Sequence, residues 1–117
     1  MDESKIKIIV DAGHGGLDGG ASGNNLVEKD LNLESSLYMF NRFKELGIPV
    51  KMTRETDEYL PKTQRVNKVK ELYNDDPNVI LISNHINAGG GEGAEVVYSL
   101  KNNSTLAKNV LDRIGEA

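Results

Sequence analysis

The chain contains two histidines, and each stands where a side chain could do chemistry. His14 lies in the glycine-rich stretch DAGHGGLDGG, residues 11–20, directly after an apolar run. His85 occupies the equivalent place after the apolar run NVILIS, residues 78–83, and is also followed by a glycine-bearing segment. Imidazole is a common metal ligand, although a single loop histidine more often makes only a hydrogen bond. Because the two positions are equivalent, we interpret both histidines as candidate metal ligands.

A third ligand has to come from an acidic side chain, because the chain has no cysteine. Catalytic zinc sites typically use three protein ligands and keep one position for water. The first loop and the segment after it offer four acidic candidates: Asp11, Asp18, Glu28 and Asp30. Glu28 stands just before a predicted helix, where the helix dipole favours an acid in any case. The residue pattern alone does not choose between Glu28 and Asp18.

Strands and helices are predicted to alternate along the chain and to position these residues. β-branched and apolar runs predict strands at residues 5–10, 48–53, 78–83 and 94–100, with a loop over residues 11–27. The alternation predicts an α/β fold: a single domain with a largely parallel mixed sheet flanked by helices on both faces. The carboxyl ends of neighbouring parallel strands lie at one edge of such a sheet, which would bring both imidazoles together.

Caps and apolar spacing predict three helices. The first follows an N-cap at Asp30 and ends at residues 47–49, the second begins near Pro61, and the third is capped by Ser104 or Thr105. Their core-facing residues are predicted to be Leu33, Leu37, Phe40 and Phe43 in the first helix, Val66, Val69 and Leu72 or Tyr73 in the second, and Leu106, Val110 and Ile114 in the third.

Composition and charge exclude several classes of protein. The length of 117 residues suits one domain, and the net charge of −4 argues against a nucleic-acid partner, which usually needs a basic face. No apolar run approaches the length of a membrane span, so we expect no membrane insertion. The start MDESKIKIIV lacks the basic and long apolar regions of a signal peptide. We expect a monomer.

Three blocks of the sequence resemble a known family. They are IIVDAGHGGLDGGASGNNLVEKDLNL, VKMTRETDEYL, and VILISNHINA followed by GAEVVY. Together they resemble the zinc-dependent N-acetylmuramoyl-L-alanine amidases of the amidase-3 type, which are cell-wall hydrolases of bacteria and their phages. The resemblance implies that Zn²⁺ is the cofactor and that His14, Glu28 and His85 are its ligands. It therefore favours Glu28 over Asp18.

The resemblance also implies a reaction, a substrate and a place of action. The family hydrolyses the amide bond between N-acetylmuramic acid and L-alanine in peptidoglycan. A protein of this kind acts at the bacterial cell wall, either secreted or, as a phage endolysin, released from the host cytoplasm.

The family's general base is a second glutamate on a strand near the C-terminus of the domain. Glu92 and Glu95 do not match it, so no catalytic base is assigned. We expect residues 1–117 to form an amidase-3-like catalytic domain that lacks its C-terminal part. The alternative is a fragment that holds zinc or binds the cell wall without turnover. A metal-free anion-binding protein is disfavoured, because the glycines are not followed by a Walker-type lysine.

Other polar residues near the histidines keep two interpretations. The glycines around His14 either leave room for a polymeric substrate or form a turn. Asn84 and Asn87 either orient His85 and meet the substrate, or cap the turn. Arg54, in the TR sequence after the second predicted strand, either pairs with a carboxylate or is solvated, and we expect it to be solvated.

Overall fold

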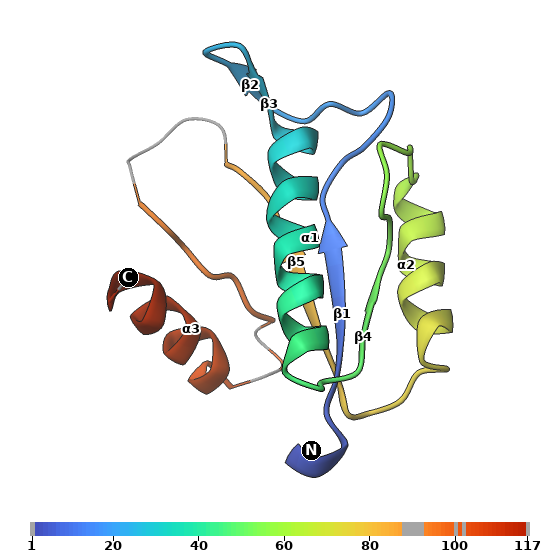
Figure 1. Cartoon of the computed structure of the whole chain (residues 1–117), viewed down its shortest axis with the longest axis vertical. Coiled ribbons are helices and arrows are strands. Elements are labelled where there is room, and N and C mark those ends of the chain that lie inside the picture. Colours follow the sequence, from blue (N-terminus) through green and yellow to red (C-terminus); the bar gives the residue numbers. More distant parts are fainter. Residues whose placement is uncertain (1, 88–92, 100, 102, 117) are drawn as a thin grey trace.

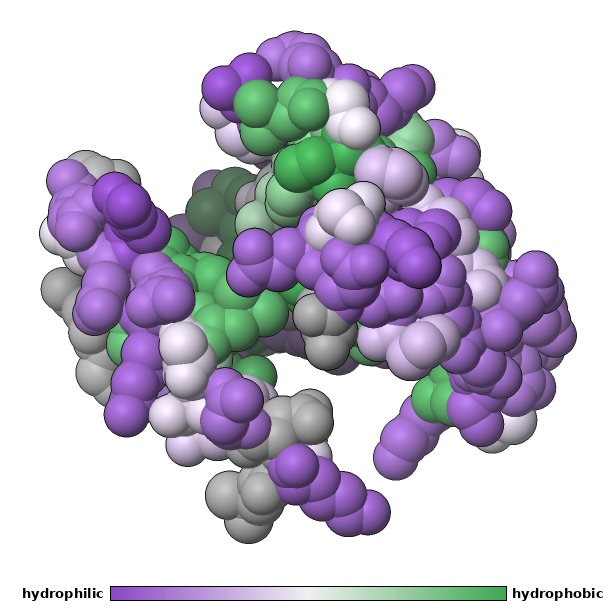
Figure 2. All heavy atoms as spheres, turned by 90° about the horizontal axis from the view of Figure 1, so that it is seen from below, coloured by the Kyte–Doolittle hydropathy of each residue, from purple (hydrophilic) through white to green (hydrophobic). Residues whose placement is uncertain are grey.

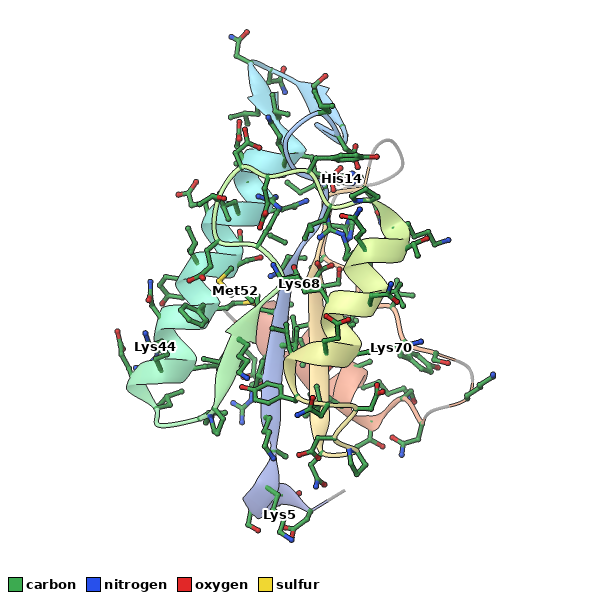
Figure 3. The ribbon with its side chains drawn as sticks, turned by 90° about the vertical axis from the view of Figure 1, so that its right-hand side faces the viewer. Lys5, His14, Lys44, Met52, Lys68 and Lys70 are labelled. Atoms are coloured by element: carbon green, nitrogen blue, oxygen red, sulfur yellow. The ribbon has the colours of Figure 1, made fainter. Side chains whose placement is uncertain are left out.

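The structure is a computed structural model, and it describes residues 2–87, 93–99, 101 and 103–116. In these residues, one sheet holds three parallel strands in the order β4-β1-β5 (Figure 1). The strands are β1 (Lys7–Ala12), β4 (Val50–Met52) and β5 (Val79–Asn84). The helices α1 (Glu28–Glu45) and α2 (Lys62–Leu72) lie on opposite sides of this sheet (Figure 3). The predicted α/β fold is confirmed, and the three strands of this sheet pair in parallel.

Strand β1 is central because its sequence is apolar on both faces. Ile8, Ile9 and Val10 are almost completely buried. Ile8 and Val10 form the hydrophobic core with Met52 of β4, and apolar residues of α1 pack against it, among them Leu37, Met39, Phe40 and Phe43. The predicted core face of α1 is therefore largely correct. The core lies between α1 and the sheet.

Helix α1 begins three residues earlier than predicted. Its N-cap is Val27, and Asp30 lies inside the first turn rather than at the cap. The first amides of a helix have no partner within it. Here backbone carbonyls of the preceding loop accept from them, since the N–H of Glu28 donates to Ala21 O and that of Lys29 to Gly19 O. A side-chain cap is therefore not needed at these amides, and Glu28 becomes the first helical residue.

The loop predicted over residues 11–27 contains regular structure at both ends. β1 continues to Ala12, and a small hairpin of β2 (Ser22–Gly23) and β3 (Leu26–Val27) precedes α1. Asn24 and Asn25 join its strands with φ of 50° and 63°. Asparagine tolerates this left-handed conformation, which two-residue hairpin turns require. At the other end of the chain a short 3-10 helix, η1 (Glu3–Lys5), precedes β1.

In the C-terminal third, the predicted strand β5 and a third helix are present, but the last predicted strand and the predicted inward face of that helix were wrong. Residues 94–99 form no strand, and residue 100 lies outside the described residues. A strand requires a hydrogen-bonded neighbour, and Val97 is 85% exposed. Helix α3 (Thr105–Glu116) exists as predicted, but its supposed inward residues Leu106, Val110 and Ile114 are exposed.

Apolar side chains therefore remain at the surface in this part of the molecule. Seen from below, apolar surface borders a hollow between the α3 side and the rest of the protein (Figure 2). In α2, Val66 is also exposed, whereas Val69, Leu72 and Tyr73 are half-buried. Among the described helices, none has the length and apolar character needed to cross a bilayer.

Candidate metal centre

The two histidines meet because β1 and β5 are hydrogen-bonded neighbours. Their register pairs Ala12 with Asn84, the last residue of each strand. His14 follows β1 by two residues and His85 follows β5 by one, so both lie at the same edge of the sheet. Figure 3 shows His14 at this end of β1. The amide of Gly13 continues the ladder by donating to Asn84 O at 3.0 Å.

Glu28 brings the third polar side chain to the same place. Its Oε2 lies 3.1 Å from His14 Nε2 and 3.3 Å from His85 Nδ1. The two imidazole rings stand edge to face, with centroids 5.1 Å apart. One ligand atom from each of the three residues lies within 4.8 Å of the others. Metal–ligand bonds of about 2 Å hold ligand atoms within about 4 Å of each other, so this group could hold a metal ion after small adjustments.

The carboxylate of Glu28 is buried and held in its ionised form. Burial raises its pKa, but hydrogen bonds from the amides of Ala21 and Ile86 and from the Asn32 side chain, together with the nearby His14, lower the pKa to about 2. The donors lie 3.0 to 3.1 Å from the two carboxylate oxygens. A charged, oriented carboxylate is the form that binds a cation.

Two glycines make room for these three side chains. A Cβ at Gly13 would overlap the imidazole of His85. A Cβ at Gly20 would lie 2.7 Å from Glu28 Oε1 and 2.7 Å from His14 Cδ2, and the φ of Gly20 is +68°. These two glycines therefore leave room for the three side chains themselves. The sequence had suggested that the glycines leave room for a substrate or form a turn.

His14 itself has a left-handed backbone, with φ of 61°. Such a conformation is costly for a non-glycine residue and persists where the surroundings fix it. Two arginines fix it here. Arg65 of α2 donates to His14 O at 2.9 Å and to Ala12 O at 2.8 Å. Arg54 donates to Ala12 O and Gly13 O, each at 3.1 Å.

The expectation that Arg54 is solvated was wrong, because its side chain is only 1% exposed. It also donates to Lys29 O and Thr56 O, so it joins three chain segments through backbone carbonyls. A guanidinium has five donors in a planar fork and can satisfy several carbonyls at once. Burial is the main cause that lowers the pKa of Arg54, followed by the like charge of Arg65.

Of the other acidic candidates, Asp11 lies beneath the site instead of in it. Its carboxylate accepts from Arg65 at 2.6 Å, Thr53 at 2.7 Å and Ser83 at 2.6 Å. Burial raises the pKa of Asp11, but these partners outweigh it and lower the pKa overall. Asp18 meets the far side of the His14 ring, with Oδ2 2.7 Å from Nδ1. The exposed Asp30 has no place in the group of three.

The two asparagines beside His85 turn to other partners. Asn84 donates to Ser36 Oγ at 3.0 Å and to Met39 Sδ, both on α1. Asn87 donates to the Glu95 side chain. Among the described contacts, neither asparagine hydrogen-bonds the His85 ring. Asn84 therefore ties β5 to α1.

Sequence reasoning missed two residues that support the site. Asn32 could have been found, because it stands one helical turn after Glu28 and such pairs touch. No sequence pattern indicates the role of Arg65, because that role depends on how α2 packs beside residues 11–14.

An open pocket of about 420 Å³ lies beside Glu28. The β2–β3 hairpin forms one wall, and Leu31, Ile86 and Asn87 contribute to the others. Ala21 and Ile86 line the pocket and also donate their amides to Glu28. Through Glu28, the group of three side chains therefore borders an open space at the surface.

Comparison with known proteins agrees with this geometry. Residues 8–117 match the amidase-3 family model, described as N-acetylmuramoyl-L-alanine amidase. The chain is 39% identical over 92 residues to the N-acetylmuramoyl-L-alanine amidase CwlM of Bacillus licheniformis, covering 77% of this chain and 35% of that protein. It spans roughly a third to a half of the curated relatives it matches first.

Solved structures show the same fold. Cwp6 from Clostridium difficile matches with a TM-score of 0.81 and 34% identity, covering 97% of this chain and 19% of that one. The CwlD amidase from Clostridioides difficile, solved in complex with the GerS lipoprotein, matches with a TM-score of 0.81 and 28% identity, covering 96% of this chain and 66% of that one. The chain therefore belongs to the amidase-3 family of N-acetylmuramoyl-L-alanine amidases.

Proposed function

We propose that this chain is a zinc-dependent amidase domain that hydrolyses the amide bond between N-acetylmuramic acid and L-alanine in peptidoglycan. The observation that carries the proposal is the convergence of His14 Nε2 and His85 Nδ1 on the buried Glu28 Oε2. Family membership supplies the reaction class. The substrate is peptidoglycan, and the place of action is the bacterial cell wall.

The three side chains suit zinc in kind and in number. Two imidazole nitrogens and one carboxylate oxygen form a recurrent ligand set of catalytic zinc sites, in which a fourth position remains open. A zinc ion held there would supply Lewis acidity, which would polarise the scissile carbonyl and lower the pKa of the attacking water so that it loses its proton more easily. The low pKa of Glu28 keeps this ligand anionic well below neutral pH.

The residues around the site explain how a polymer could reach it. The side chain of His85 is 46% exposed, whereas that of Glu28 is 4% exposed, so the group opens toward the His85 side. The adjoining pocket offers apolar side chains from Leu26, Leu31 and Ile86. An extended peptide or glycan strand can therefore lie across the opening while Glu28 stays shielded.

Hydrolysis adds water across the amide and gives a lactyl carboxylate on the sugar and a free amino group on L-alanine. A general base is needed for the proton of the attacking water. We assign none among the described residues. We propose that residues 1–117 belong to an amidase-3 catalytic domain.

The proposal is tested by zinc content and by product chemistry. We expect about one zinc per chain by elemental analysis of protein purified without chelator. We expect incubation with purified cell walls, using the protein that contains this chain with its natural flanking sequence, to release new amino-terminal L-alanine without new reducing sugar ends.

Glu28→Gln should abolish zinc binding and amine release, and Glu34→Gln, on the exposed face of the same helix, should preserve both. Zinc binding without amine release would favour the alternative, a zinc-holding or wall-binding fragment. A folded protein without zinc after reconstitution would contradict the proposal.

A further inference from the structure

We infer that Asp18 is a positioning residue for the metal centre, acting through the ring of His14. The inference rests on the proposed function. It assigns a role to Asp18, which the residue pattern had left beside Glu28 as a candidate third ligand. Asp18 Oδ2 lies 2.7 Å from His14 Nδ1, and His14 Nε2 on the opposite side of the ring lies 3.1 Å from Glu28 Oε2. The imidazole is thus fixed between two carboxylates, one inside the site and one outside it.

Hydrogen bonds hold both the backbone and the carboxylate of Asp18 in place. Its backbone pairs with Gly15 through two hydrogen bonds, of 2.8 and 3.0 Å, in an isolated bridge. Its second carboxylate oxygen, Oδ1, accepts from the amide of Gly20 at 3.2 Å. These contacts within the loop between Gly15 and Gly20 therefore fix the orientation of the Asp18 carboxylate. This carboxylate points at the only ring nitrogen of His14 that the site does not use.

The chemistry of imidazole gives this contact a consequence. A neutral ring carries its proton on one nitrogen and a lone pair on the other, and only the lone pair binds a metal. A carboxylate that accepts from Nδ1–H keeps the lone pair on Nε2, where it can bind a metal. Asp18 therefore selects the tautomer and the ring orientation that direct Nε2 toward Glu28.

His85 has a different arrangement, which makes the role of Asp18 specific. Its Nδ1, not its Nε2, faces Glu28 at 3.3 Å. Asp18 contacts His14 alone of the two histidines. Loss of Asp18 should therefore release one ligand and leave the other two in place. This predicts weakened metal binding and not its complete loss.

The test measures zinc affinity by competition with a chromogenic chelator, on wild-type protein and on Asp18→Ala. We expect the zinc dissociation constant of Asp18→Ala to rise about 10- to 100-fold, the usual effect of removing a partner that orients a metal-bound histidine. A second readout is the His14 Nδ1–H resonance in nitrogen–proton spectra of the zinc-loaded proteins. It should be protected from exchange in the wild type and lost to exchange in the variant.

Asp57→Ala is the matched control. Asp57 is a half-exposed carboxylate that also anchors the glycine loop, through the amide of Gly16 at 2.7 Å, but it touches neither histidine. We expect the zinc dissociation constant of Asp57→Ala to change less than about threefold. Thermal unfolding of the zinc-free proteins checks that all three are folded.

Three results would overturn the inference. If Asp18→Ala binds zinc as tightly as the wild type, Asp18 does not position His14. If Asp57→Ala weakens zinc binding as much as Asp18→Ala does, the effect belongs to the loop and not to the carboxylate beside His14. A folded wild type that binds no zinc overturns this inference together with the proposed function, whereas the first two results leave the proposed function intact.

Discussion

The two histidines come from two loops that the protein supports very differently. The anchored loop, residues 11–20, carries His14, whose side chain is 27% exposed. Its carbonyls accept from Arg54 and Arg65, and its side chains meet the buried network around Asp11. The exposed loop, residues 84–87, carries His85, whose side chain is 46% exposed. Within the described part of the chain, no arginine donates to the carbonyls of this second loop.

This difference indicates how the two halves of the site are stabilised. The anchored loop is held by the protein itself, including a non-glycine residue in a left-handed conformation. The exposed loop is tied at its start by β5 and at Ile86, whose amide donates to Glu28. A metal ion would therefore add little order to the first loop and much to the second.

The largest expected effect comes from removing the carboxylate beneath the anchored loop. Asp11→Ala removes the buried carboxylate and leaves the half-buried Arg65 without its charged partner, and breaking a buried ion pair typically costs about 3–5 kcal/mol of folding free energy. Urea unfolding followed by circular dichroism measures this loss. The control is Asn87→Ala in the exposed loop, where the loss should stay within about 0.5 kcal/mol. Equal losses at the two positions would contradict the contrast between the loops.

Zinc should stabilise the exposed loop more than the anchored one. A ligand at 100 times its dissociation constant stabilises the folded state by about 2.7 kcal/mol. We expect hydrogen exchange to slow most at residues 85–87 when zinc is added, and to change less at residues 13–16. Removal of zinc with a chelator should reverse the change. Greater protection of the anchored loop would mean that the metal, and not the arginines, holds His14.

A smaller effect is expected from Arg54→Lys. Lysine keeps the charge but cannot reach the four carbonyls that Arg54 serves, so buried carbonyls lose donors. We expect a loss of about 1–3 kcal/mol in unfolding free energy. Arg42→Lys is the control, because Arg42 forms only an exposed pair with Glu45 and should change stability very little. An equally small change at Arg54 would show that its hydrogen bonds do not stabilise the loop.

The smallest effect is a difference in acid sensitivity. The pKa of Asp11 is lowered on folding, so its stabilising contribution is present above the unfolded pKa of about 3.9 and is lost as the pH falls through the folded value. The stability gap between wild type and Asp11→Asn should therefore narrow as the pH falls below about 4. Urea unfolding at a series of pH values measures this gap. A gap that stays constant would show that Asp11 does not titrate differently in the folded protein.

The sequence predicted what depends on local pattern and on pairs of neighbouring strands. The apolar runs of β1 and β5 and the helical spacing of Leu37, Phe40 and Phe43 gave the correct α/β fold. The same reasoning placed His14 and His85 at one edge of the sheet. The choice of Glu28 came from family resemblance, and its metal-binding role stays a prediction.

The features that were missed depend on long-range packing. Arg54 becomes buried only because carbonyls from three segments surround it. The start of α1 moved to Glu28 because loop carbonyls replace a side-chain cap. Residues 94–99 have β-forming side chains but form no ladder, and apolar spacing in α3 could not show whether another surface covers it. None of these outcomes is determined by a short stretch of sequence.

The pairing of Ala12 with Asn84 has a further consequence for folding. Within the described residues β5 pairs only with β1, and a slip of one residue between them would move His85 by about 3.3 Å and turn successive side chains to the opposite face. The three ligand atoms could not then meet. Under the proposed function, only correctly registered molecules would bind zinc, so misaligned chains would be both metal-free and less stable.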